Sequence, residues 1–412
     1  MRLTQKIRIF LTLEQERVLW VLSEKCRLIY NFALAERIDA WNKGKNVNYI
    51  KQQNDLPCIK EKYPEYKYVY AKVLQMTLRT LDADYKSFYS LWKKGDRKAK
   101  PPKFKGKNHF TTMIYNQSGF KIENGKVSLS HFYNSTPLEF TIPEKFKFGK
   151  VYQVSVSMKD GKYYLSIVYD EPTKGYVDNG KYVAIDLGVS NIVTAVNIDG
   201  KFIQIKNKRV DKYWQPKIEK LQSRRDHCKK GSRRWYKLNT LLKKCKRKCA
   251  NQLRDFQHKL STKLVKNTRA NAIIVGKLNA KQLSKCSKGD KKADRSLHRA
   301  TQNTGLMGRF VQFLTYKAER VGKRVIEIDG QDTTKMCCVC GKKQKRELWE
   351  RSIKCECGNE VDRDKNSAVN IMVRYLSQNA LVNGLDTFVS NLRQTGLLIG
   401  SYSQEAFAFR QG

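Results

Sequence analysis

The chain has 412 residues, of which 40% are hydrophobic, so it is long enough for two or three domains with hydrophobic cores. Its 82 lysines and arginines outnumber 38 aspartates and glutamates, and the resulting charge of +44 predicts a polyanionic partner such as nucleic acid. No stretch approaches about 18 consecutive apolar residues, no secretory leader opens the chain, and no glycine-rich nucleotide motif occurs, so we expect a cytoplasmic protein without a membrane or small-molecule partner.

The first part of the chain predicts a small β-barrel interrupted by helices. Residues 1–10 alternate polar and apolar side chains, as a strand does, and Thr12 then suits the N-cap of a helix. A pair of alternating segments surrounds Lys159-Asp160-Gly161, which predicts a hairpin. We therefore assign residues 1–10 and 96–175 to the barrel and residues 11–95 to a helical insertion.

An α/β order of elements begins near residue 181. The segment KYVAID is a buried strand that ends in Asp186, and residues 211–268 have the pattern of two antiparallel, very basic helices. The other expected elements are strands at 271–278 and 323–329, an irregular loop at 284–296, a helix at 303–322 and a helix from near Asp364. The fold class is thus multidomain α+β, with an α/β domain at 180–336 and 359–380, and a C-terminal tail at 381–412.

Four cysteines have the spacing of a metal site. Cys337 and Cys340 are separated by two residues, Cys355 and Cys357 by one, and a glycine follows each pair where a tight turn needs it. In a reducing compartment such pairs suit a tetrahedral Zn²⁺ ion, which predicts a structural zinc ribbon at 337–358. The neighbouring Cys338 offers an extra thiol that would shift one ligand, and a redox role for the first pair is the other interpretation.

Two aspartates are candidate ligands for a catalytic metal. Asp186 ends a buried strand before a glycine turn, and Asp364 lies at the start of a helix in VDRDKNSAVNI. Each position also has an ordinary explanation, because aspartates cap strand ends and helix N-termini.

The order of these motifs resembles the TnpB family, whose members accompany insertion-sequence transposons and are related to type V CRISPR effectors. The similarity includes the strand with its aspartate, the basic helices, CxxC…CxC and then DRDxNxAxNI. It extends to the N-terminal segments LTLEQERVL…CRLIYNFALAER and PPKFKGKN, and to the final SYSQEAFAFRQG, so it covers nearly the whole chain.

The resemblance implies a wedge barrel, a helical recognition insertion and a RuvC (RNase H-like) nuclease domain that carries the zinc ribbon. It implies RNA-guided cleavage of double-stranded DNA, with a transposon-derived guide RNA that pairs with the target strand. It also implies three carboxylates that bind Mg²⁺, of which Asp186 is the first and Asp364 the third.

The second carboxylate of the family is missing from its usual places. A glutamate is expected at Gly276, or in some relatives at Gly330, and glycine has no side chain to bind metal. The nearest acids are Glu327, Asp329 and Asp332, and Glu327 shares a strand face with Asp329. We take Glu327 as the replacement, although a solvent-facing acid would look the same in the sequence.

Three functions are compatible with these motifs. We favour an RNA-guided, Mg²⁺-dependent DNA endonuclease, because two retained aspartates would repel each other without a metal. The alternative is a nuclease-dead transcriptional repressor that binds RNA and DNA without cutting. A zinc-ribbon RNA-binding protein explains the charge but leaves the ordered acidic motifs unexplained.

Guide RNA should bind the basic helices and the basic loop at 93–108, where phosphates would neutralise the positive charge. A solvated helix face and a plain linker are the simpler interpretations of the same two segments. The expected phosphate contacts are Arg224, Arg225, Lys229, Lys230, Arg233, Arg234, Lys103 and Lys105.

Overall fold

The computed structural model describes residues 1–277, 291–301, 307–344 and 350–396. The chain divides into two compact units, Met1–Pro172 and Thr173–Gly412. Within the described residues, no helix is both long and apolar enough to cross a membrane.

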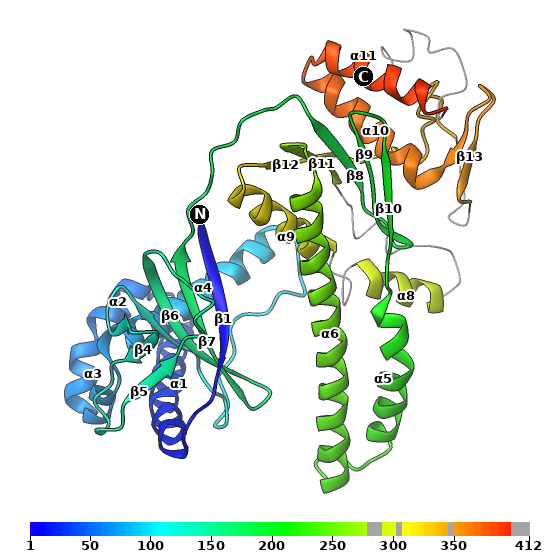
Figure 1. Cartoon of the computed structure of the whole chain (residues 1–412). Coiled ribbons are helices and arrows are strands. Elements are labelled where there is room, and N and C mark those ends of the chain that lie inside the picture. The colour runs from blue at the N-terminus through cyan, green and yellow to red at the C-terminus, as the bar shows by residue number, and fades with distance from the viewer. Residues whose placement is uncertain (278–290, 302–306, 345–349, 397–412) are drawn as a thin grey trace. The chain divides into compact units, whose positions relative to one another are not determined.

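The first unit contains two antiparallel sheets that share one hydrophobic core (Figure 1). The four-stranded sheet has the order β1 (Arg2–Ile9), β7 (Lys162–Asp170), β6 (Val151–Lys159), β2 (Met113–Asn116). The three-stranded sheet has the order β3 (Phe120–Glu123), β4 (Lys126–Leu129), β5 (Leu138–Thr141). The hairpin expected around Lys159-Asp160-Gly161 is present, and the positive φ angles of Asp160 (52°) and Gly161 (68°) are those of a tight two-residue turn.

Helices fill the segment between β1 and β2, as the apolar spacing predicts. They are α1 (Leu13–Asn42), α2 (Tyr49–Asn54), α3 (Leu56–Lys62), the 3₁₀ helix η1 (Pro64–Tyr68) and α4 (Ala71–Lys93). Thr12 is the N-cap of α1, because its hydroxyl accepts from the Gln15 amide while the Gln15 side chain accepts from the Thr12 amide. The α1 helix then buries Leu19, Leu22 and Leu34 in the core of the unit.

The second unit is built on a mixed five-stranded sheet. Its order is β10 (Phe202–Lys206), β9 (Asn191–Asn197), β8 (Tyr182–Asp186), β11 (Ala272–Lys277), β12 (Arg324–Asp329). The β10, β9 and β8 strands are antiparallel, whereas β8, β11 and β12 run parallel, so β8 and β11 end at the same edge of the sheet.

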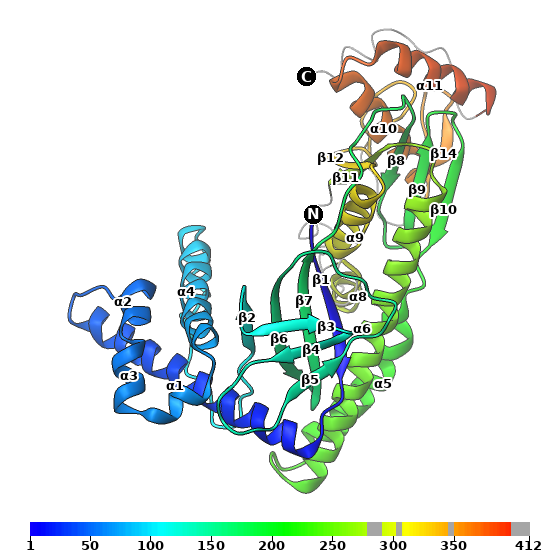
Figure 2. The ribbon, with the colours of Figure 1, turned by 60° about the vertical axis from the view of Figure 1, so that its left-hand side comes forward.

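Each face of this sheet packs on a different hydrophobic layer (Figure 2). Tyr182 and Ala184 of β8 point to the layer of α10 (Arg363–Gln378), while Ile185 points to the layer of α6 (Arg233–Asn267) and α9 (Met307–Arg320). The α5 helix (Val210–Asp226) packs along α6, which confirms the expected pair of basic helices. Because side chains alternate along a strand, the face of every residue on β8, β11 and β12 follows from these layers.

Two segments differ from the expectation. Helix α8 (Lys291–Thr301) includes the last part of the loop expected at 284–296, while residues 284–290 lie outside the described residues. Helix α11 (Val382–Gln394) occupies the start of the expected C-terminal tail and buries Phe388 and Leu392 against the α10 layer. Apolar side chains at helical spacing explain the α11 helix, because they cover the open side of α10. The short strands β13 (Ser352–Lys354) and β14 (Glu360–Asp362) pair next to the second pair of cysteines.

Phe388 tests whether α11 belongs to the core of the second unit. Its side chain is fully buried, so Phe388→Ala should lower the free energy of unfolding by about 3–5 kcal/mol. Chemical unfolding followed by tryptophan fluorescence measures this difference, with the exposed Ser390→Ala as the matched control. A loss below about 1 kcal/mol would mean that α11 is dispensable for the fold.

Candidate functional site

The two aspartates singled out in the sequence lie together on the α10 face of the sheet. Asp186 ends β8 on the same face as Ala184, and Asp364 occupies the first turn of α10. Asp364 is not the N-cap of this helix. That role belongs to Asp362, whose carboxylate accepts from the backbone amides of Asp364 and Lys365 at 3.1 Å. The carboxylate of Asp364 is therefore left available for another function.

Burial, followed by the neighbouring Asp364 carboxylate, raises the pKa of Asp186 to about 7 from an ordinary value of 3.8. The Ser367 side chain, the Arg363 charge and the Leu187 amide act in the opposite direction and lower it. The net effect means that two negative charges at this position are costly until a cation neutralises them. Such a pair of oxygen ligands suits a hard divalent cation such as Mg²⁺.

Three polar neighbours of the pair were not identified from the sequence. Asn191, at the start of β9, donates to Asp364 Oδ2 at 2.9 Å, and Arg363 Nε lies 3.8 Å from Asp364 Oδ1. Ser367, one turn after Asp364, hydrogen-bonds to Asp186. The position of Asn191 directly after the glycine turn that follows Asp186 is the signal that could have indicated it.

Glu327, the acid expected to complete the site, does not reach the Asp186–Asp364 pair. Glu327 pairs with Val275, is exposed, and shares its face of β12 with Val325, which packs on the α9 layer. Asp186 points to the opposite face of the same sheet, so the choice of Glu327 was wrong because of strand alternation.

The other two nearby acids are also engaged elsewhere. Asp329 lies on the Glu327 face, and its carboxylate accepts from the Gln331 amide at 3.0 Å. Asp332 lies 3.6 Å from Lys335 Nζ and 3.3 Å from Lys343 Nζ. A metal site would bring three or more ligand atoms of histidine, cysteine or acidic side chains within 4.8 Å of one another. Within the described residues, the only such group consists of cysteines. The carboxylate site therefore has two acids in the described part of the chain.

Two glycines occupy the face where a third acid would complete the pair. Val275 pairs with Ile185, so Gly276 follows at the level of Asp186 and on its face. A Cβ atom at Gly276 would lie 2.7 Å from Ile371 Cδ1 and 3.9 Å from the Cα of Gly330. Gly276 and Gly330, the two positions where the glutamate of the family is expected, are thus neighbours in space.

The four expected cysteines form one compact cluster. The Cys337 and Cys357 sulfurs are 3.7 Å apart, and the Cys340 and Cys355 sulfurs are 3.5 Å apart. These separations suit a tetrahedral Zn²⁺ ion, for which Zn–S bonds of about 2.3 Å require sulfurs roughly 3.8 Å apart. Cys338 is buried outside this group, so it does not replace one of the four.

Turn geometry and hydrogen bonds support the cysteine cluster. Gly341 and Gly358 both have positive φ angles, 74° and 82°, and donate to the carbonyls of the first cysteine of each pair. Burial tends to raise the pKa of Cys337, but hydrogen bonds from the Cys340 and Val339 amides and from Asn359 outweigh it and lower that pKa. Cys337 is thus prepared to bind a metal as a thiolate.

The basic residues chosen as phosphate contacts fall into two groups. Arg225 donates a hydrogen bond to the Asp226 carboxylate at 2.6 Å. The Lys105 ammonium lies 3.6 Å from the centre of the Tyr30 ring, and burial lowers the pKa of Lys105. These two side chains are already engaged in contacts within the protein. The others are exposed to solvent, namely Arg224, Lys229, Lys230, Arg233, Arg234 and Lys103.

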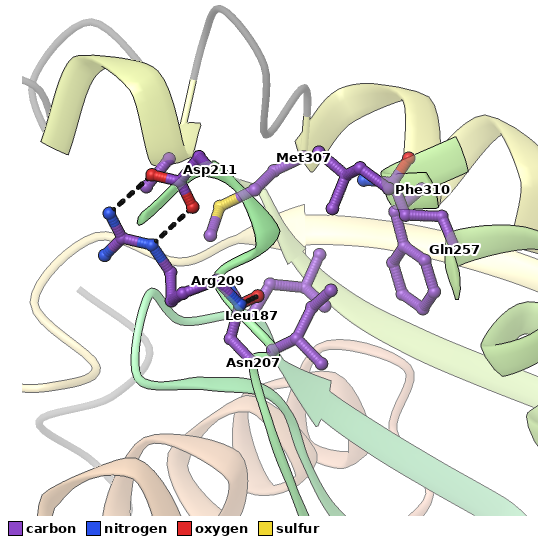
Figure 3. Close-up of a pocket in the computed structure, with 10 residues that line it drawn as sticks. Leu187, Asn207, Arg209, Asp211, Gln257, Met307 and Phe310 are labelled. Atoms are coloured by element: carbon purple, nitrogen blue, oxygen red, sulfur yellow. Dashed lines mark hydrogen bonds and ion pairs between the residues drawn. The ribbon is translucent and has the colours of Figure 1, made fainter. Parts of the chain in front are cut away.

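A small cavity near the site is too narrow for a substrate. It lies beside Leu187 and Phe310 and has a volume of about 10 Å³, which is room for a single water molecule. Figure 3 shows the pair Arg209–Asp211 at its wall, joined by hydrogen bonds of 2.9 and 2.8 Å. This cavity includes neither Asp186 nor Asp364 in its lining.

Three family models match successive parts of the chain. They are described as a helix-turn-helix domain (residues 1–46), a probable transposase (residues 166–287) and a Cas12f1-like TNB domain (residues 308–371). The first description does not fit the structure, since residues 2–9 form a strand and residues 13–42 form one continuous helix.

Known proteins resemble the chain over most or part of its length. A "putative RNA-guided DNA endonuclease" of Streptomyces pristinaespiralis is 27% identical, with 92% of this chain and 91% of the relative covered. "TnpB-like protein L79" of Acanthamoeba polyphaga mimivirus is 37% identical over 34% of this chain and 26% of its own length. A Cas12f1 chain, solved by cryo-electron microscopy in a complex with sgRNA and target DNA, shares the fold, with a TM-score of 0.55, 13% identity, and 90% and 98% of the chains covered.

The cysteine cluster should contain about one zinc ion per chain. Cys340→Ser should abolish this content, because three thiolates leave the site open, whereas the exposed Cys58→Ser should leave it unchanged. Elemental analysis of the purified variants measures the metal. Chelation should also make residues 337–358 sensitive to protease while the first unit stays intact. A wild-type protein that folds and resists protease without metal would contradict the assignment.

The stability of the magnesium-free protein should depend on the protonation of Asp186. Because its folded pKa of about 7 exceeds the ordinary 3.8, protonation contributes stability that is fully present below about pH 4 and is lost as the pH rises through 7. Asp186→Asn, which is always neutral, should therefore exceed the wild type by about 2–4 kcal/mol at pH 8 and match it near pH 4. Equal differences at both pH values in urea unfolding would show that the charge is not buried.

Proposed function

The chain belongs to the TnpB family, and from that premise we propose that it is an RNA-guided protein that binds and cleaves double-stranded DNA. The single observation that carries the proposal is the pairing of Asp186 and Asp364 on one face of the sheet. The relatives named as RNA-guided DNA endonucleases support it, as does the fold shared with the Cas12f1 chain. The charge of +44 supplies the attraction for a guide RNA and a DNA duplex.

In this proposal the domains follow the family order. Residues 1–10 and 96–175 form the wedge barrel, and residues 11–95 form the recognition insertion. The RuvC domain comprises residues 180–336 and 359–380, in which β8 and α10 carry the acids. Residues 337–358 form the zinc ribbon, with Zn²⁺ bound by Cys337, Cys340, Cys355 and Cys357.

Asp186 and Asp364 are the proposed ligands of Mg²⁺, which would activate water and stabilise the leaving oxygen when bound. The two side chains hold their positions without the ion. Asn191 fixes Asp364 by its hydrogen bond, and Ser367 fixes Asp186. Arg363 offsets part of the negative charge of the pair. Asn191, Ser367 and Arg363 thus prepare an acidic site in an otherwise strongly basic protein.

The proposed nucleic-acid contacts are cations at the turn between α5 and α6. Arg224, Lys229, Lys230, Arg233 and Arg234 are exposed there, as is Lys103 in the basic loop of the first unit. Phosphate oxygens would pair with these side chains without reading the sequence, so binding should weaken steeply with salt. Sequence selection would then come from base pairing with the guide RNA.

A second candidate is guided binding without cleavage, as in a repressor. The observation in its favour is the neighbouring pair Gly276 and Gly330, which removes the third acid from the Asp186 face. The two candidates share the guide RNA and the target. They differ only in whether two acids suffice for catalysis.

Cleavage of a matched plasmid by the protein with its co-expressed RNA and Mg²⁺ tests the proposal. We expect the wild type to cut, and Asp186→Ala to cut on the order of 100-fold more slowly, because a direct metal ligand is lost. Gly276→Glu combined with Ile371→Val, which removes the Cδ1 atom that would lie 2.7 Å from the new Cβ atom, should accelerate cutting, since it adds a third carboxylate on the Asp186 face. Guided binding without cutting would contradict the nuclease and select the repressor. Absence of guided binding would contradict both.

A further inference from the structure

Two asparagines of α10 hold the backbone that leads into the cysteine cluster. Asn366 Nδ2 donates to the carbonyls of Thr333 and Met336 at 3.1 and 2.7 Å. Asn370 Nδ2, one turn later, donates to the same two carbonyls at 2.9 and 2.8 Å. Two side chains therefore attach one short segment of backbone, between β12 and the first cysteine pair, to the helix that carries Asp364.

The orientation of Asn366 is fixed by its partners. Backbone carbonyls only accept, and the Cys338 amide only donates, so the side-chain nitrogen must face Thr333 and Met336 while Oδ1 accepts from Cys338 at 2.8 Å. Both asparagines are buried, with 0% and 2% of their surface exposed. Removal of all these donors would leave two carbonyls unsatisfied in the core.

A second connection leads from the same segment to the other aspartate. The hydroxyl groups of Thr333 and Ser367 are 3.0 Å apart, and Ser367 hydrogen-bonds to Asp186. On the other side of the cluster, Asn359 Nδ2 donates to Cys337 Sγ at 3.3 Å. Hydrogen bonds thus run from the cysteine cluster to the elements that carry both acids.

We propose that Asn366 and Asn370 are positioning residues that make the arrangement of Asp186 and Asp364 depend on metal in the cysteine cluster. A bound ion would cross-link the turn at 337–341 to the turn at 355–358 and so fix the carbonyls that the asparagines hold. When the ion is lost, these carbonyls move, and the first turns of α10 lose their anchor. The inference rests on the proposed zinc site and deepens the proposed function, because it makes the ribbon a control on the carboxylate pair.

Hydrogen exchange followed by mass spectrometry tests this coupling without guide RNA, DNA or cleavage. In the wild type, chelation of the cluster metal should speed exchange of residues 363–371 by about 10-fold or more, as well as that of residues 337–341. In the metal-loaded double variant Asn366→Ala/Asn370→Ala, residues 363–371 should already exchange at the chelated rate. Chelation should then affect the two cysteine turns, residues 337–341 and 355–358, and no longer residues 363–371.

Asn379→Ala is the matched control, because Asn379 is the exposed C-cap of α10 and its side chain donates to the Tyr375 carbonyl of that helix. It should keep the wild-type response to chelation. If chelation of the wild type deprotects residues 337–341 but leaves residues 363–371 unchanged, the asparagines merely fill the core and the proposal is overturned.

The single variants keep the proposal testable if the double variant does not fold. Each carbonyl has two donors, so Asn370→Ala leaves both carbonyls paired and should reduce the response of residues 363–371 only in part. The double variant should reduce the exchange response of residues 363–371 by more than the sum of the reductions in the two single variants. An Asn370→Ala protein with the full wild-type response would contradict the shared anchor. Failure of plasmid cleavage would leave these results unaffected, so the two proposals fail separately.

Discussion

The structure depends on the close approach of two carboxylates that lie 178 positions apart in the chain, Asp186 and Asp364. Burial and mutual repulsion raise the pKa of Asp186, so the arrangement costs free energy in the absence of a cation. A fold keeps such a pair only if many other contacts hold it. Here they include the strand pairing of β8, the packing of α10 and the side chains of Asn191 and Ser367.

The pair of acids Asp186 and Asp364 lies in a protein with a charge of +44. The opposite signs have different tasks, since lysine and arginine attract phosphates over long distances while the acids attract a divalent cation at short range. The helices α5 and α6 expose their cations at the turn that connects them. In the proposed function, separate elements of the second unit would therefore attract the polyanion and carry out chemistry on it.

Local patterns in the sequence predicted most of the elements and the cysteine cluster, because each depends on a few adjacent residues. The Thr12 cap, the Asp160-Gly161 turn and the four clustered cysteines are of this kind. The error at Glu327 arose because a sequence gives the alternation of one strand but not which face of the sheet meets α10.

The hydrogen bonds around the two acids could not be predicted from the sequence either, because they join residues that are far apart in the chain. Asn366 and Asn370 bond to backbone carbonyls more than 29 residues away, and no local pattern encodes those partners. The helix α11 was missed because its role is to cover α10, which only the assembled layers reveal.

The most direct measurement of the central claim is the position of Mn²⁺, a visible substitute for Mg²⁺, in crystals examined by anomalous diffraction. The account predicts a manganese peak that contacts the carboxylates of both Asp186 and Asp364, and no such peak in Asp186→Ala. A peak bound to only one of the two acids, or no peak in the wild type at high manganese concentration, would contradict it.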